Sequence, residues 1–95
     1  MAKKGRADAL VAKFVEAAEM QRDNPACHLM IAGKSTAEDD VVHVIEVWAS
    51  EADWKRARNS DEVAAWAKDM PGLVASWPKS ATFDAAGGKG LPASM

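Results

Sequence analysis

The chain has 95 residues, of which 48% are apolar and 27% are charged, and its formal net charge at pH 7 is −2. This length predicts a single domain, and the apolar fraction excludes an intrinsically disordered chain. The near-neutral balance lacks the basic footprint of proteins that bind nucleic acid or anionic membranes, so neither is expected as a partner.

The first part of the chain predicts a helix. Apolar side chains recur there at intervals of four and three residues, at Leu10, Phe14 and Ala17. This spacing puts them on one face of a helix that we expect from Arg6 to about Met20. Pro25 follows soon afterwards and disfavours helix in the residue before it.

Two strands are expected next. Residues 26–32 form a short, mostly apolar run, and residues 33–40 are polar and typical of a turn. Residues 41–48 are rich in β-branched side chains, which favour strands. Because this second run contains few polar residues, we expect both of its faces to be covered.

A second helix and a last strand complete the predicted order. Ser50 is a candidate N-cap of a helix over residues 51–70, and Asn59-Ser60-Asp61 is expected to kink or split it. Pro71-Gly72 ends that helix, and a last strand is expected from Leu73 to Trp77, or on to Phe83. We expect a domain over residues 4–84 and a flexible tail over residues 85–95, where glycines accumulate.

Apolar runs and cysteine usage indicate the class of protein. No apolar run reaches 18 residues, and the N-terminus has no apolar stretch typical of a signal peptide. A cytoplasmic location is therefore expected. Cys27 is the single cysteine, so the chain has neither an internal disulfide nor the spacing of a cysteine metal site.

Several short motifs resemble the antibiotic biosynthesis monooxygenase family. They are Lys4-Gly5 before the first helix, Asn24-Pro25-Ala26-Cys27 before the next strand, residues 46–52 (Glu-Val-Trp-Ala-Ser-Glu-Ala), and Asn59-Ser60-Asp61. Their order and spacing fit over residues 4–78, and the stretch from Glu46 to Asp61 is the most specific part. The resemblance implies an α+β, ferredoxin-like fold with two helices on one face of an antiparallel sheet.

The same resemblance implies an assembly and an activity. Two such sheets pack face to face as a dimeric α/β barrel, so a homodimer is expected. Family members of known activity are often oxygenases of quinol-like or polyketide aromatics that use neither a metal nor a flavin. The expected function is thus a cofactor-independent monooxygenase with a hydrophobic aromatic substrate, and no cofactor is expected. The alternative is a non-catalytic homodimeric module that binds a hydrophobic small molecule or a protein partner.

Candidate site residues follow from these two functions. His43 and His28 are candidate bases, because imidazole titrates near neutral pH. Trp54, Trp66 and Trp77 are candidate walls of an aromatic pocket, with Arg58 and Asn59 at its mouth. Each residue also has a purely structural interpretation: a histidine or tryptophan packed in the core or at an interface, and a solvated helix face for Arg58 and Asn59.

The chain departs from the family pattern at three points. Many members carry a histidine on the second helix where this chain has Ala57. The haem-degrading branch needs residues that are absent at Ala57 and Ala67, which excludes haem degradation. Only residues 1–4 precede the first turn, so the first strand of the ferredoxin-like order is missing or truncated. That strand is expected upstream of Met1, or supplied by another segment, or replaced by a rearranged sheet.

Overall fold

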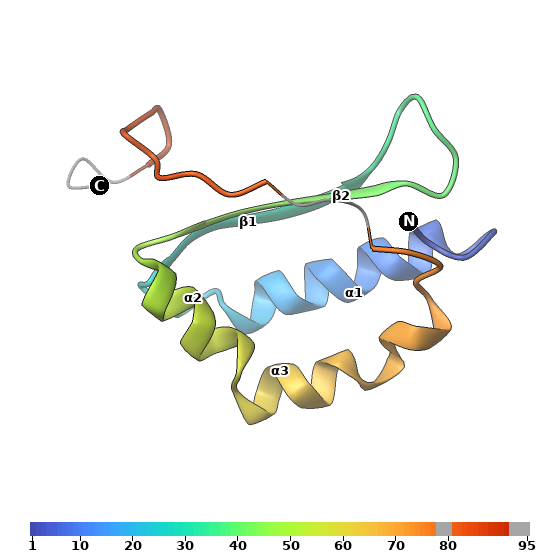
Figure 1. Cartoon of the computed structure of the whole chain (residues 1–95), viewed down its shortest axis with the longest axis horizontal. Helices are drawn as coiled ribbons and strands as arrows, with labels where there is room; N and C mark the ends of the chain where they lie inside the picture. Colours follow the sequence, from blue (N-terminus) through green and yellow to red (C-terminus); the bar gives the residue numbers. More distant parts are fainter. Residues whose placement is uncertain (78–80, 92–95) are drawn as a thin grey trace.

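A computed structural model describes residues 1–77 and 81–91. The elements in chain order are α1 (Ala7–Met20), β1 (Cys27–Lys34), β2 (Val42–Trp48), α2 (Glu51–Arg58), α3 (Asp61–Trp66) and the 3-10 helix η1 (Ala67–Gly72). The two strands form one layer, and the three α-helices lie on the same side of it (Figure 1). The expected α+β, ferredoxin-like order without a full first strand is confirmed.

The register of the sheet determines which side chains face the helices. β1 and β2 pair antiparallel, with Ala32 opposite Val44 and Ile31 opposite Ile45. Successive side chains of a strand point to opposite faces. Ala32 and Val44 therefore face the helices, whereas Ile31 and Ile45 face away from them. The register shifts between Cys27 and Leu29, which leaves His28 in an irregular step of β1.

The hydrophobic core lies between the inner face of the sheet and the helices. Its buried members are Ala2, Leu10, Val42, Met70 and Leu73. The outer face has no such cover: 38% of Leu29, 51% of Ile31 and 53% of Ile45 is exposed. The sequence predicted cover on both faces of residues 41–48, and among residues 1–77 and 81–91 the core packs only on the helix side.

β1 is shifted slightly from its predicted range. It continues to Lys34, although residues 33 and 34 were expected in the turn. Gly33 pairs with His43, and Lys34 pairs with Val42. Pairing with the β-branched strand β2 therefore keeps these two residues of β1 in an extended conformation. The Nζ of Lys34 lies 2.6 Å from a carboxylate oxygen of Asp8 on α1, and this ion pair joins the strand to the helix layer.

The predicted interruption of the second helix is confirmed. The Ser50 hydroxyl accepts a hydrogen bond from the Asp53 N–H at 3.1 Å and begins α2. The Ser60 hydroxyl accepts from the Val63 N–H at 3.2 Å and begins α3. A serine that caps a new helix satisfies N–H groups that have no partner in the preceding turn. The chain therefore turns at residues 59–60 and directs α3 back along α1.

The expected last strand is reduced to a single β-bridge between Ala2 and Val74. The Ala2 N–H donates to the Asp40 carbonyl at 2.7 Å, and the Lys3 N–H donates to the Leu73 carbonyl at 2.8 Å. Residues 1–3 thus lie between the start of β2 and the segment after η1. A strand forms only where its backbone pairs with a neighbour. Residues 1–3 offer residues 73–77 a single pair, Ala2 with Val74.

The edge of β2 that faces away from β1 is therefore unpaired in the described part of the chain. Its nearest backbone hydrogen bond is the one to Asp40, just before the strand begins. Residues 81–91 lie away from the helices (Figure 1), and Phe83 is 87% exposed. Residues 78–80 of the predicted last strand and 92–95 of the predicted tail lie outside the described residues, and the domain limits stay a prediction. Among described residues, no helix is long and apolar enough to cross a membrane.

Candidate functional site

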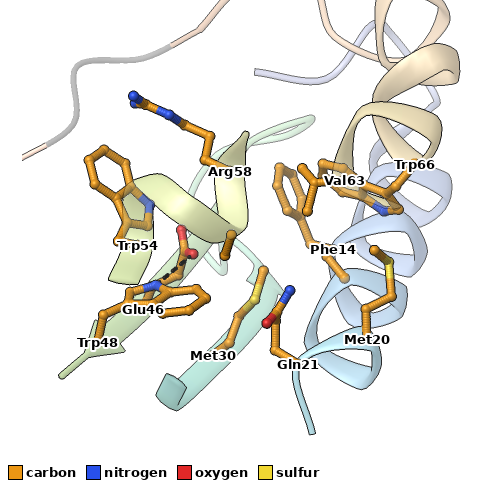
Figure 2. Close-up of a pocket in the computed structure, with 12 residues that line it drawn as sticks. Phe14, Met20, Gln21, Met30, Glu46, Trp48, Trp54, Arg58, Val63 and Trp66 are labelled. Atoms are coloured by element: carbon orange, nitrogen blue, oxygen red, sulfur yellow. Dashed lines mark hydrogen bonds between the residues drawn. The ribbon is translucent and has the colours of Figure 1, made fainter. Parts of the chain in front are cut away.

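A cavity of about 220 Å³ lies between the inner face of the sheet and the helices. Most of its wall is aromatic, aliphatic or thioether, and three polar side chains reach it. The lining residues are Phe14, Ala17, Met20, Gln21, Met30, Glu46, Trp48, Trp54, Ala57, Arg58, Val63 and Trp66. Figure 2 shows that they come from both strands and from all three α-helices. We call this space the inner cavity.

One wall is formed where α1 packs against α3. The rings of Phe14 and Trp66 lie 5.6 Å apart at an interplanar angle of 57°, a tilted arrangement that aromatic pairs favour. The indole N–H of Trp66 donates to the Lys13 carbonyl at 2.7 Å. The Lys13 ammonium lies 5.4 Å from the centre of the Trp66 ring. These contacts fix the ring plane that faces the inner cavity.

The opposite wall carries the charges of the site. The indole N–H of Trp48 donates to Glu46 Oε1 at 3.2 Å, and both side chains come from the inner face of β2 (Figure 2). On α2, the Arg58 guanidinium lies 4.5 Å from the centre of the Trp54 ring, within cation–π distance. An aromatic cavity therefore has one carboxylate and one guanidinium in its lining.

A second cavity, of about 280 Å³, lies beside the first and is more polar. We call it the outer cavity. It is lined by Gln21, Asn24, Ala26, Asp53, Arg56, Ala57, Ser60 and Glu62. Gln21 and Ala57 line both spaces, so these two side chains stand between them. The Asn24 amide donates to Gln21 Oε1 at 3.0 Å and restrains one part of this boundary.

The family model described as "Antibiotic biosynthesis monooxygenase" matches residues 1–69, which is well over half of the chain. The chain belongs to the antibiotic biosynthesis monooxygenase family. Searches of curated proteins and of solved structures gave no match. The resemblance expected from the sequence is thus confirmed.

The inner cavity brings together only some of the residues predicted from the sequence. Trp54, Trp66 and Arg58 line the inner cavity. Asn59, at the end of α2, is exposed and lines neither cavity. Trp77 is 68% exposed and also lines neither. The roles proposed for these residues stay predictions.

Both candidate bases lie apart from the inner cavity of this monooxygenase-family chain. His43 pairs with Gly33, and its neighbours Val42 and Val44 belong to the core side. The alternation of a strand therefore directs His43 to the outer face, where it is exposed. His28, in the irregular step of β1, is half-buried and lines neither cavity.

Several lining residues were not singled out from the sequence, and Glu46 is the most consequential. It is the one carboxylate in the lining of the inner cavity. Strand parity could have found it, since Glu46 lies two residues from both Val44 and Trp48 and so shares their face. Phe14 and Met30 were assigned only to core segments, and nothing in their spacing separates a core position from a cavity wall.

Cys27 borders the same region without the properties of a reactive thiol. Partial burial, and next the negative charge of Glu46, raise the pKa of the Cys27 thiol, which keeps it protonated at neutral pH. Its Sγ lies 3.8 Å from the Leu29 carbonyl. Among residues 1–77 and 81–91, no group of three or more His, Cys, Asp or Glu side chains could hold a metal ion.

Proposed function

We propose that this protein is a cofactor-independent monooxygenase of a small aromatic compound of the hydroxyarene or quinol class. The observation that supports this proposal is the inner cavity, an aromatic-walled space with a single carboxylate in its lining. A cavity of about 150 Å³ is large enough to bind benzene. The inner cavity, at about 220 Å³, therefore has room for one substituted ring.

The chemistry requires no electron carrier, because the substrate itself is oxidised. When a quinol is converted to a hydroxyquinone, one oxygen atom of O₂ enters the ring and the other leaves as water. The ring supplies all four electrons. The protein has to orient the ring, stabilise the electron-rich anion and exclude water.

Glu46 and Arg58 are the residues we propose for these tasks. Trp48 holds one oxygen of the Glu46 carboxylate, and the other is available to accept a hydrogen bond from a substrate hydroxyl. A carboxylate is a much weaker base than a phenolate, so Glu46 takes the proton only as the ring reacts. Arg58, held over Trp54, would stabilise the anion that develops.

Oxygen uptake with a panel of quinols tests this function. Wild-type protein should consume O₂ in proportion to the quinol converted, and Glu46→Gln should lower kcat by about 10²-fold, the scale of a lost general base. His43→Ala and His28→Ala test the two bases predicted from the sequence, and we expect each to retain most of the activity. A loss confined to a histidine variant would exclude Glu46 as the base.

A second candidate function is a binding module without catalysis. The observation that favours it is the position of both histidines outside the inner cavity, which leaves a carboxylate as the base in that space. Binding of one quinol molecule per chain, with no oxygen consumed by the wild type or by any variant, would favour this alternative.

The functional unit that we propose is a homodimer. The outer face of the sheet exposes Leu29, Ile31 and Ile45, and a second copy packed face to face would cover them. The same contact would cover His43. A cytoplasmic location stays a prediction from the sequence.

A further inference from the structure

Ala57 stands at the boundary between two cavities of opposite character. The inner cavity is mainly apolar, and the outer cavity is lined mostly by polar side chains. Ala57 has only a methyl group, and Gln21 is the other side chain that lines both spaces. The inner cavity and the polar side chains of the outer cavity are therefore neighbours at residue 57.

The outer cavity offers hydrogen-bond partners of a definite kind. Asp53 is already engaged, because it accepts from Arg56 at 2.9 Å and from the Ser50 hydroxyl at 2.7 Å. The Ser60 hydroxyl donates to the Ala57 carbonyl at 2.7 Å and caps α3. Within the described residues, the Glu62 carboxylate has no hydrogen bond or ion pair. Its oxygens remain to accept hydrogen bonds from hydroxyl groups.

We propose that the ligand has two parts: a hydroxyarene ring in the inner cavity and a polyhydroxylated substituent, such as a sugar, in the outer cavity. Ala57 is the position that admits this substituent, and Glu62 and the amide nitrogen of Gln21 bind it. This inference rests on the proposed function, because the ring occupies the same inner cavity. It specifies that function by defining the class of substrate.

Two probes separate the inference from the proposed function. Hydroquinone fills the inner cavity alone, and 4-hydroxyphenyl β-D-glucopyranoside adds a sugar to the same ring. Their affinities are measured by titration calorimetry without oxygen, so that neither is consumed. The glucoside should bind wild-type protein at least fivefold more tightly than hydroquinone. Ala57→Leu should lower the affinity for the glucoside by at least fivefold more than it lowers the affinity for hydroquinone, because the added methyl groups close the boundary to the outer cavity.

Matched variants show where the sugar binds. Glu62→Ala, in the outer cavity only, should lower the affinity for the glucoside and not that for hydroquinone. Ala52→Leu is the control, since Ala52 is exposed on the same helix as Ala57 and lines neither cavity. Hydroquinone that binds alone, or an Ala57→Leu variant that weakens both ligands equally, would overturn the inference and leave the proposed function intact. If neither compound binds the wild-type protein, both the inference and the proposed function are contradicted.

Discussion

Hydrogen bonds of the indole N–H groups hold two tryptophans of the inner cavity, Trp48 and Trp66. Trp66 donates to a backbone carbonyl and Trp48 donates to a carboxylate, and both side chains line the inner cavity. A tryptophan with a hydrogen-bonded N–H keeps one orientation and leaves its apolar surface for a ligand. Trp77 has no such position in the fold and is largely exposed. Composition alone cannot distinguish these roles.

Replacement of two tryptophans tests this distinction. Trp66→Ala removes the contact with Phe14 and the hydrogen bond to Lys13, and should lower the free energy of unfolding by about 3 kcal/mol. Trp77→Ala should change it by less than about 0.5 kcal/mol, as expected for an exposed side chain. Urea unfolding followed by circular dichroism measures both. Equal losses would contradict the difference in burial.

The raised pKa of Cys27 predicts that its thiol is alkylated slowly. Because burial disfavours the thiolate, alkylation by iodoacetamide at pH 8 should be slower in the folded protein than in urea. The rate should rise with pH around a midpoint above that of the unfolded chain. The unfolded thiol loses its proton at lower pH, so this group lowers stability as pH rises past the unfolded pKa. A midpoint at or below that of the unfolded chain would contradict the direction of the shift.

Serine caps divide the second half of the chain into two short helices. α3 has six residues, too few to be stable alone, so its direction depends on the cap at Ser60 and on packing against α1. The turn between α2 and α3 also brings Ala57 and Ser60 to the outer cavity. The position of the site thus depends on a local hydrogen bond.

The Ser60 cap can be tested with one residue and two substitutions. Ser60→Ala should lower the free energy of unfolding by about 1 kcal/mol, because the Val63 N–H loses its acceptor. Ser60→Asp should recover part of this loss, since aspartate accepts the cap hydrogen bond from the Val63 N–H but cannot donate one to the Ala57 carbonyl. Thermal unfolding of the three proteins decides the question. An equal loss in both variants would place the effect elsewhere than in the cap.

The elements were predictable to the extent that their causes are local. Helical spacing predicted α1, β-branched residues predicted β2, and Ser60 predicted the break between α2 and α3. The strand predicted after η1 is reduced to one bridge. It was predicted wrongly because the sequence of a segment does not show whether a partner strand is present. The site was only partly predictable, since a cavity wall such as Met30 and a core residue have the same local pattern.

In the described part of the chain, the sheet has one side that the helices cover and one side that exposes apolar residues. Three helices shield the inner face, while Ile31 and Ile45 lie opposite each other and exposed on the outer face. An apolar surface of this kind is typical of an interface. The proposed homodimer accounts for the β-branched character of a strand that the described residues cover on its helix side only.

Charges on the outer face should therefore separate the subunits. The protein has a mass of 10.1 kDa, and light scattering after size-exclusion chromatography should give about twice this value for the wild type. Ile31→Lys with Ile45→Lys should yield a monomer, because paired ammonium groups cannot be buried without partners. Lys68→Glu, exposed on the helix side, is the control and should stay dimeric. A monomeric wild type would contradict the proposed assembly.

Glu46 also lies on β2, the strand whose outer edge is unpaired in the described part of the chain. An exposed strand edge can recruit further strands and seed aggregates, and an inward-pointing charge on such an edge is a known deterrent. Glu46 projects from this strand into the cavity and carries such a charge. Glu46→Gln removes this charge, so we expect the variant to aggregate more readily than the wild type as well as to react more slowly. Light scattering recorded beside every assay of a Glu46 variant separates lost chemistry from lost solubility.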